Sequence, residues 1–137
     1  MPTITIHTDG ASRGNPGEAG AGALIVFPDG TEYTVSEYLG NKTNNEAEYQ
    51  AIALALERAK QRAGKQQTKA YDVIIHMDSE LAQKQLTGEY KLKNETIQNL
   101  FIDIWNKAVP FQSVSYRHVP REHNKRADTL ANQALDT

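Results

Sequence analysis

The chain has 137 residues, of which 39% are hydrophobic and 23% charged, and this predicts a single globular domain over residues 1–137. It has no cysteine, which excludes disulfides and thiolate metal sites and favours a cytoplasmic location. Its formal net charge of −2 argues against a protein that holds nucleic acid by bulk positive charge, so a polyanionic partner would need local basic patches or bound cations.

No part of the sequence predicts a membrane segment. No apolar run approaches the roughly 20 residues that span a bilayer, and no basic and apolar leader precedes the first predicted strand. We therefore expect no membrane partner, and we expect the protein to act as a monomer.

The first half of the chain is predicted to form a strand-rich sheet followed by a long helix. β-Branched residues bounded by Gly and Pro predict strands at 3–9, 21–27 and 31–39. The PDG sequence at 28–30 is typical of a tight turn between the last two strands. Residues 44–63 are rich in Ala, Leu, Glu, Lys and Gln, which predicts a helix with an Asn as its N-cap and Gly64 as its stop.

The second half alternates strands and helices. The nearly continuous apolar stretch at 71–78 predicts a strand that is buried on both faces, in a central parallel position. Helices are predicted at 79–88, 94–109 and 124–135, and a strand at 111–119. The order βββαβααβα predicts an α/β fold with a mixed five-stranded sheet and helices on both faces. Trp105 is expected in the core, on the buried face of its helix.

Four carboxylates lie at the edges of predicted elements. Asp9 ends the first strand, Glu48 heads an apolar helix stripe, Asp78 ends the central strand, and Asp128 lies beside the apolar stripe of the last helix. Each has an ordinary alternative: turn initiation, the helix dipole, helix capping or solvation. Acids that converge repel one another unless divalent cations lie between them. Their oxygens select Mg²⁺ or Mn²⁺, and two such ions about 4 Å apart can promote phosphodiester hydrolysis.

Four segments carry a family resemblance. TDGASRGNPG, TNNEAEYQA, MDSELAQKQLTGEYKLKN and REHNKRADTLANQAL, in this order and spacing, closely resemble the type 1 ribonuclease H family over practically the whole chain. The resemblance implies a ribonuclease H-like fold and an endoribonuclease that cuts the RNA strand of RNA/DNA hybrids, leaving 5′-phosphate and 3′-hydroxyl ends. It also implies two Mg²⁺ ions, with Mn²⁺ as a substitute, bound by Asp9, Glu48, Asp78 and Asp128.

The resemblance further implies a division of labour between the two ions. The ion held by Asp9, Glu48 and Asp78 would stabilise the leaving 3′-oxygen. The ion held by Asp9 and Asp128 would activate the attacking water.

The glycine-rich segment after Asp9 has a substrate role in the family. Its backbone approaches the RNA 2′-hydroxyls, and the matching positions here are Gly10, Ala11 and Ser12, with Asn15 nearby. The segment lacks the Gly-Lys-Ser/Thr ending of a nucleotide-binding loop, so we expect no nucleotide cofactor.

Four further polar residues match substrate-binding positions. Asn44 and Asn45 match residues that reach into the minor groove of the hybrid, although helix N-capping is an alternative role. Thr43 and Asn94 match the pocket that holds a phosphate of the DNA strand, and their hydroxyl and amide donors suit that role.

The chain departs from the family in two places. The family's lysine-rich extra helix is missing, and Lys91 and Lys93 are what remains of it, so this is a compact variant for which weaker and more salt-sensitive hybrid binding is expected. The family's loop histidine would fall at His118, which lies in a predicted strand, so Arg121 or His123 would have to replace it as a catalytic residue. For His123, a solvated surface imidazole is the alternative.

Two other functions compete with hybrid cleavage. A non-catalytic module that binds hybrids or RNA would gain from losing four acids, so their presence argues against it. A transposase- or resolvase-like nuclease that cuts DNA would carry a different glycine and asparagine context.

Overall fold

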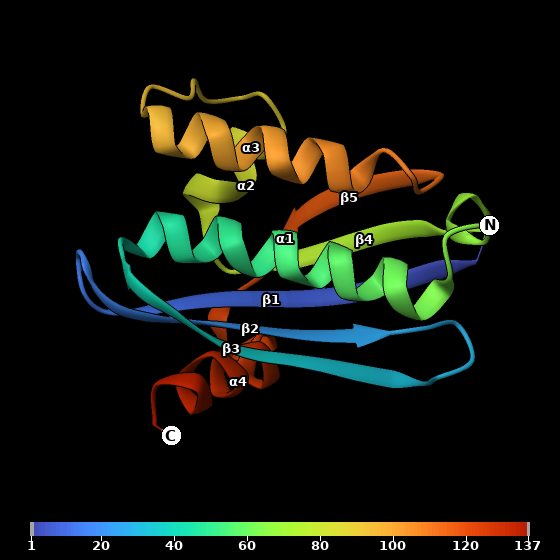
Figure 1. The fold of residues 1–137 in the computed structure, drawn as a ribbon, viewed down its shortest axis with the longest axis horizontal. Helices are drawn as coiled ribbons and strands as arrows, with labels where there is room; N and C mark the ends of the chain where they lie inside the picture. Colours follow the sequence, from blue (N-terminus) through green and yellow to red (C-terminus); the bar gives the residue numbers. More distant parts are fainter. Residues whose placement is uncertain (1, 137) are drawn as a thin grey trace.

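A five-stranded mixed sheet forms the frame of the computed structural model, which describes residues 2–136 (Figure 1). The strands are β1 (Thr3–Gly14), β2 (Gly17–Val26), β3 (Glu32–Lys42), β4 (Asp72–Met77) and β5 (Ser113–His118), in the spatial order β3-β2-β1-β4-β5. β1, β2 and β3 pair antiparallel, whereas β4 runs parallel to both β1 and β5. The predicted central, parallel position of β4 is confirmed.

Helices cover both faces of this sheet. They are α1 (Asn44–Ala63), α2 (Glu80–Leu86), α3 (Glu95–Ala108) and α4 (Lys125–Leu135), with two single 3₁₀ turns, η1 (Thr68–Ala70) and η2 (Arg121–His123). α1 and α3 lie on one side and α4 on the other (Figure 1). The neighbouring strands β1 and β2 show this directly, because a Cβ atom at Gly10 would meet α1 and one at Gly22 would meet α4. The predicted α/β fold and the order βββαβααβα are confirmed.

The core lies between the sheet and α1. Ile6 of β1 and Ile75 of β4 are fully buried against this side, together with Ile52 and Leu56 of the apolar stripe of α1. β4 is not buried on both faces, and this part of the prediction is wrong. Its alternate residues are only half-buried, because α4 packs on β1, β2 and β3 and leaves the other face of β4 without a helix.

Capping residues define the ends of α1. Thr43 is the N-cap, rather than the expected Asn: its Oγ1 accepts from the backbone N–H of Glu46 (3.1 Å), while Glu46 Oε1 accepts from the N–H of Thr43 (2.8 Å). The helix ends at Gly64, as predicted, where φ is +89°. Ser79 caps α2 through its Oγ, which accepts from the N–H of Ala82 (3.2 Å), so the carboxylate of Asp78 is not the cap.

The first hairpin is longer than predicted. β1 continues past Asp9 to Gly14 and pairs with β2 from Thr5 to Gly14, so the glycine-rich segment after the predicted strand end at residue 9 also belongs to the strand. Glycine lowers strand propensity, but these glycines allow helices to contact the sheet. A Cβ atom at Gly22 would lie 2.3 Å from the Ala127 oxygen of α4. Tertiary packing therefore decides the local structure here.

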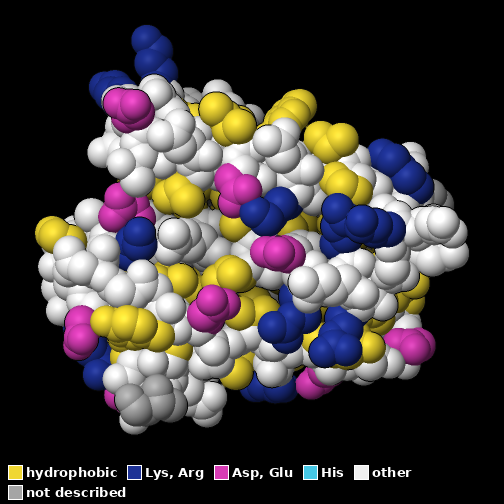
Figure 2. Space-filling model, viewed as in Figure 1, with side chains coloured by type: hydrophobic (Ala, Val, Ile, Leu, Met, Phe, Trp, Pro, Cys, Tyr) yellow, Lys and Arg dark blue, Asp and Glu magenta, His cyan; other side chains and the backbone are white. Residues whose placement is uncertain are grey.

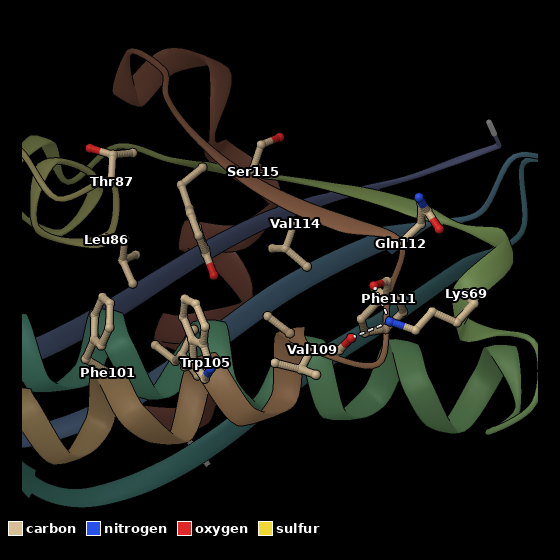
Figure 3. A pocket seen from close by; sticks show the side chains of 13 residues that line it. Lys69, Leu86, Thr87, Phe101, Trp105, Val109, Phe111, Gln112, Val114 and Ser115 are labelled. Atoms are coloured by element: carbon tan, nitrogen blue, oxygen red, sulfur yellow. Dashed lines mark hydrogen bonds between the residues drawn. The ribbon is translucent and has the colours of Figure 1, made fainter.

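Trp105 is not in the core. It is 62% exposed and lines an apolar groove of about 620 Å³ between α3 and β5 (Figure 3). Ile97 and Ile104, two turns apart, face the core instead. Trp105 follows Ile104 directly and is therefore rotated by about 100° around the helix, away from the core.

The surface carries mixed charge. Figure 2 shows acidic and basic side chains interspersed on the side of the molecule that α1 and α3 cover. In the part of the chain that the structure describes, no helix combines the length and apolar character needed to cross a membrane.

Candidate metal centre and nucleic-acid interface

The candidate site lies where β4 ends and β1 continues. The parallel pairing of these strands runs from Thr3 and Asp72 to His7 and His76, and β4 ends one residue later, at Met77. Asp78 follows the end of β4, and Asp9 lies on the part of β1 beyond the pairing. The carboxyl ends of parallel strands are where ligands bind in α/β sheets, so two acids meet at such a position.

Gly10 brings the third acid to this place. A Cβ atom at residue 10 would lie 2.3 Å from the carbonyl carbon of Ala47 and 2.4 Å from the backbone nitrogen of Glu48, so only glycine allows α1 to lie this close to β1. The backbone N–H of Gly10 also donates a hydrogen bond to the Glu48 carboxylate. Glu48 is thereby held against Asp9.

Asp9, Glu48 and Asp78 form a tight group, which we call the tri-carboxylate. Each offers one oxygen, and these oxygens lie within 4.8 Å of one another. Asp9 is 6% exposed and Glu48 8%, and Glu48 Oε2 is buried without a hydrogen-bond partner among the described residues. Three hard oxygen donors and an unsatisfied buried carboxylate oxygen fit a divalent cation of the Mg²⁺ or Mn²⁺ type.

The pKa values of Asp9 and Glu48 are raised, because both acids are buried close to other carboxylates. Burial raises the pKa of Asp9, and the charges of Glu48 and Asp78 raise it further. Burial also raises the pKa of Glu48, although the hydrogen bonds from Asp9 and Gly10 and the charge of Arg121 oppose this rise. Closely spaced carboxylates repel one another when both are ionised, so the raised pKa values favour protonation of this pair, and a metal ion would compete with the proton.

Asp128 joins the group through Asp9. It lies in the first turn of α4, lines the same pocket as Asp9 and contributes to the raised pKa of Asp9, but it is not part of the tri-carboxylate. Asn132 donates to Asp128 Oδ1 (3.2 Å) and so orients the carboxylate from one turn further along α4. Asp9 is therefore the member of the tri-carboxylate that interacts with the fourth acid.

The four acids share one pocket with most of the predicted substrate-binding residues. This pocket, of about 680 Å³, is also lined by Gly10, Ala11, Ser12, Asn15, Thr43, Asn44, Asn45 and Arg121. Its polar groups are held in place by the protein. The N–H of Asn44 donates to Asn15 Oδ1 (3.1 Å), Asn45 Nδ2 donates to Gln85 Oε1 (3.2 Å), and Ser12 Oγ donates to the Lys42 oxygen (2.9 Å).

Asn94 lies in an adjoining pocket of about 600 Å³, which shares Thr43 and Asn45 with the first and is also lined by Lys91 and Lys93. Asn94 and Thr43 are the N-caps of α3 and α1, and each uses its side-chain oxygen to accept from a backbone N–H. The hydroxyl proton of Thr43 and the NH₂ group of Asn94 are donors that capping does not use. The segment between α2 and α3 contains no helix, consistent with the missing lysine-rich helix.

Arg121 and His123, the two replacements for the family's loop histidine, are placed differently. Both belong to η2, but Arg121 lines the acidic pocket and acts electrostatically on Glu48, whereas His123 is exposed and lines neither pocket. His118 lies in β5, as predicted.

Sequence reasoning missed two residues beside the site. Gln85 of α2 accepts from Asn45 Nδ2 (3.2 Å) and from the hydroxyl of Tyr49 (2.9 Å). Asn124 is 1% exposed and donates to the backbone oxygen of Thr8, which precedes Asp9. In the sequence, a glutamine on a short helix and an asparagine at a helix start look like ordinary surface and capping residues, so no local signal could distinguish them.

Comparison with known proteins decides the family. The family model described as Reverse transcriptase-like matches residues 7–134. The crystal structure of LC11-RNase H1 in complex with an RNA/DNA hybrid superposes with a TM-score of 0.90 at 40% identity, over 97% of this chain and 96% of that one. The chain belongs to the ribonuclease H family.

Further ribonuclease H structures and sequences are similar over nearly the whole chain. RNase H1 of the halophilic archaeon Halobacterium salinarum has a TM-score of 0.88 at 38% identity, with 98% of both chains covered. A bifunctional protein of Mycobacterium tuberculosis is 35% identical over 97% of this chain, which spans only 35% of that relative's own length.

Proposed function

We propose that this chain is a metal-dependent endoribonuclease that hydrolyses the RNA strand of RNA/DNA hybrids and leaves 5′-phosphate and 3′-hydroxyl ends. The observation that carries the proposal is the tri-carboxylate at the carboxyl end of β4, in one pocket with polar residues from β1 and α1. Membership of the ribonuclease H family supports the reaction, and the hybrid bound to a relative at 40% identity supports the substrate class.

Two Mg²⁺ ions, for which Mn²⁺ can substitute, are the proposed cofactors. Asp9, Glu48 and Asp78 would hold one, and Asp9 and Asp128 the other, because Asp9 belongs to the tri-carboxylate and Asp128 lines the same pocket. When bound, such ions supply a nucleophilic water at neutral pH and stabilise charge on the leaving 3′-oxygen. Hydrogen bonds to Gly10 and Asn132 orient the carboxylates of Glu48 and Asp128 for this role.

The same pocket offers contacts to the RNA strand. Backbone groups of Gly10, Ala11 and Ser12 would face the 2′-hydroxyls, which distinguish RNA from DNA, while the side chains of Asn44 and Asn45 would enter the minor groove. Asn45 is suited to positioning a duplex, because Gln85 holds its Nδ2 and thereby sets the direction of its amide oxygen. Asn15, bonded to the N–H of Asn44, would stabilise this end of α1.

The adjoining pocket would hold a phosphate of the DNA strand. The N-terminal ends of α1 and α3 meet there, and helix N-termini favour anions. Thr43 and Asn94 each have a hydrogen-bond donor that capping does not use, and these donors could bind the phosphate oxygens. Lys91 and Lys93, which also line this pocket, would add positive charge.

For the role of the family's loop histidine, Arg121 is the stronger candidate because it lines the acidic pocket. If Arg121 contacts a phosphate near the acids, Arg121→Ala lowers the rate of cleavage in steady state more than His123→Ala does. The opposite order would assign the role to His123.

Two properties of the whole protein remain proposals. We place it in the cytoplasm, in agreement with the lack of cysteine, and we propose that it acts as a monomer.

A cleavage panel tests the function. End-labelled RNA/DNA hybrid, double-stranded RNA and double-stranded DNA are incubated with the protein in Mg²⁺ or in EDTA. The proposal predicts cleavage of the RNA strand of the hybrid in Mg²⁺ alone, with 5′-phosphate ends. Binding of the hybrid without cleavage would instead identify a non-catalytic module, and cleavage of DNA would identify a transposase- or resolvase-like nuclease.

A further inference from the structure

Asn124 lies between η2 and α4 and carries one of the most buried polar side chains of the described chain, with 1% of its surface exposed. Its Nδ2 donates to the backbone oxygen of Thr8 (2.9 Å). A carbonyl oxygen can only accept, so the NH₂ group must face Thr8 and the orientation of the amide is determined. Asn124 Oδ1 has no hydrogen-bond partner among the described residues, so the bond to Thr8 is what directs this side chain.

This hydrogen bond is not a helix cap. An asparagine in front of a helix ordinarily accepts from a backbone N–H of the first turn, and Asn124 makes no such side-chain bond. Its backbone oxygen instead accepts from the N–H of Asp128 (3.1 Å). The side chain of Asn124 therefore contacts β1 while its backbone contacts the residue that carries the fourth acid.

Two carboxylates depend on these contacts. Thr8 directly precedes Asp9 on the part of β1 that β4 no longer pairs with. Asp128 lies one turn after Asn124 and lines the same pocket as Asp9. Asn124 thus connects the strand that carries Asp9 to the helix that carries Asp128. It does so at Thr8, just beyond the last residue of β1 that pairs with β4.

Other contacts hold α4 on the sheet further along the helix. Ser36 Oγ of β3 donates to the Leu130 oxygen (2.6 Å), and Gly20 and Gly22 of β2 allow the helix to approach closely. These contacts fix α4 against β2 and β3, whereas Asn124 fixes the start of the helix against β1. The two kinds of contact can therefore be tested separately.

We propose that Asn124 is a positioning residue that sets the separation of Asp9 and Asp128 and so controls the metal position that these two acids share. The inference rests on the metal-binding role in the proposed function. The tri-carboxylate has its own supports in Gly10 and β4, so loss of the Asn124 amide affects the Asp9–Asp128 position first.

A double-mutant cycle on metal binding tests this role. Mn²⁺ is titrated by calorimetry into the full chain and into Asn124→Ala, Asp128→Asn and the double variant. Loss of a residue that orients a metal ligand costs about 10- to 100-fold in affinity. We expect a loss of this size for the weaker Mn²⁺ site in Asn124→Ala, a loss at the same site in Asp128→Asn, and no further loss in the double variant.

Hybrid cleavage supplies a second readout. In Asn124→Ala, kcat at limiting Mg²⁺ falls with the metal affinity and recovers as Mg²⁺ is raised, whereas KM for the hybrid stays within about twofold, because the residue touches no substrate-binding group. Asn124→Leu keeps about the side-chain size, removes the donor and adds no charge, and it shows the same metal dependence if the alanine variant does not fold.

Ser36→Ala is the matched control. It removes a hydrogen bond between α4 and a strand without touching the start of the helix, and it leaves both the Mn²⁺ isotherm and the Mg²⁺ dependence unchanged. Additive losses in the double variant, or an Asn124→Ala isotherm like that of Ser36→Ala, would overturn the inference. If the wild-type chain binds Mn²⁺ but cleaves no hybrid, the proposed function fails and the isotherms still decide the role of Asn124.

Discussion

The acidic pocket and the groove beside Trp105 are similar in size, about 680 and 620 Å³, and opposite in chemistry. The groove exposes apolar side chains, as most protein surfaces do. The charged residue that lines it, Lys69, donates hydrogen bonds to the backbone oxygens of Val109 and Phe111. The acidic pocket instead forces carboxylates together against their electrostatic repulsion. The conflict of charges, rather than the cavity volume, supports the acidic pocket as the proposed site of the chemistry.

The largest expected effect is loss of the charge of the tri-carboxylate. Asp78→Asn keeps the size of the side chain and removes a metal ligand, so kcat should fall by at least about 100-fold, because metal ions supply several kcal/mol of transition-state stabilisation and about 1.4 kcal/mol corresponds to tenfold. Gel shift should show that hybrid binding is retained. Full activity of the variant in Mg²⁺ would remove Asp78 from the mechanism.

A smaller effect is expected at the positioning residues of the same pocket. Asn45→Ala removes an amide that Gln85 orients, and KM for the hybrid should rise by about 3- to 10-fold, the value of one hydrogen bond, with a smaller fall in kcat. Steady-state kinetics over a range of hybrid concentrations measures both. A fall in kcat at unchanged KM would indicate a role in the chemical step instead.

The repulsion in the acidic pocket should also be visible in stability. Because the pKa values of Asp9 and Glu48 are raised in the folded protein, the proton-bound acids stabilise the fold below their ordinary pKa, and this contribution is lost as pH rises through the raised values. In EDTA, the midpoint of thermal unfolding should therefore fall between about pH 5 and pH 8, by roughly 2–8 °C for each 1 kcal/mol lost.

Two controls sharpen this experiment. Asp9→Asn removes one of the repelling charges, so its unfolding midpoint should depend less on pH in EDTA. Mg²⁺ should raise the midpoint of the wild type at pH 8 and have little effect on Asp9→Asn. A wild-type midpoint that rises with pH in EDTA would contradict the raised pKa values.

The smallest effect is expected in the groove. Trp105→Ala should change the free energy of unfolding by less than about 1 kcal/mol and leave cleavage unchanged, because the side chain is 62% exposed and remote from the acids. Its neighbour Ile104 is 1% exposed, and Ile104→Ala should cost about 2–5 kcal/mol. Urea unfolding of both variants measures the difference. Equal losses of unfolding free energy would contradict the exposed position of Trp105.

The elements whose bounds depend on local propensity were the easiest to predict from the sequence. The bounds of α1 follow from helix propensity, and its Gly64 stop is readable, although its N-cap is Thr43 rather than an asparagine. The positions of Asp78 after the end of β4 and of Asp128 in the first turn of α4 were also readable, because strand ends and helix starts are local signals. The prediction that Asp9 ends the first strand was wrong. The extension of β1 past Asp9 was not readable, because Gly10 and Gly22 serve contacts to helices that are distant in sequence.

The remaining differences have the same origin. The exposure of Trp105 depends on which face of α3 meets the core, and the roles of Gln85 and Asn124 depend on partners 36 to 116 residues away along the chain. The placement of Arg121 in the acidic pocket, and of His123 outside it, likewise depends on a long-range contact, because the N–H of Val119 just before η2 donates to the oxygen of Met77 at the end of β4. Long-range contacts of this kind leave no pattern in a single sequence.

The proposed metal centre depends on one juxtaposition, that of the carboxylate oxygens of Asp9, Glu48 and Asp78 around a divalent cation. Anomalous diffraction from a crystal of the protein soaked in Mn²⁺ measures it most directly. We predict a manganese peak coordinated by all three side chains. Carboxylates that point apart, with no manganese between them at saturating concentration, would contradict the account.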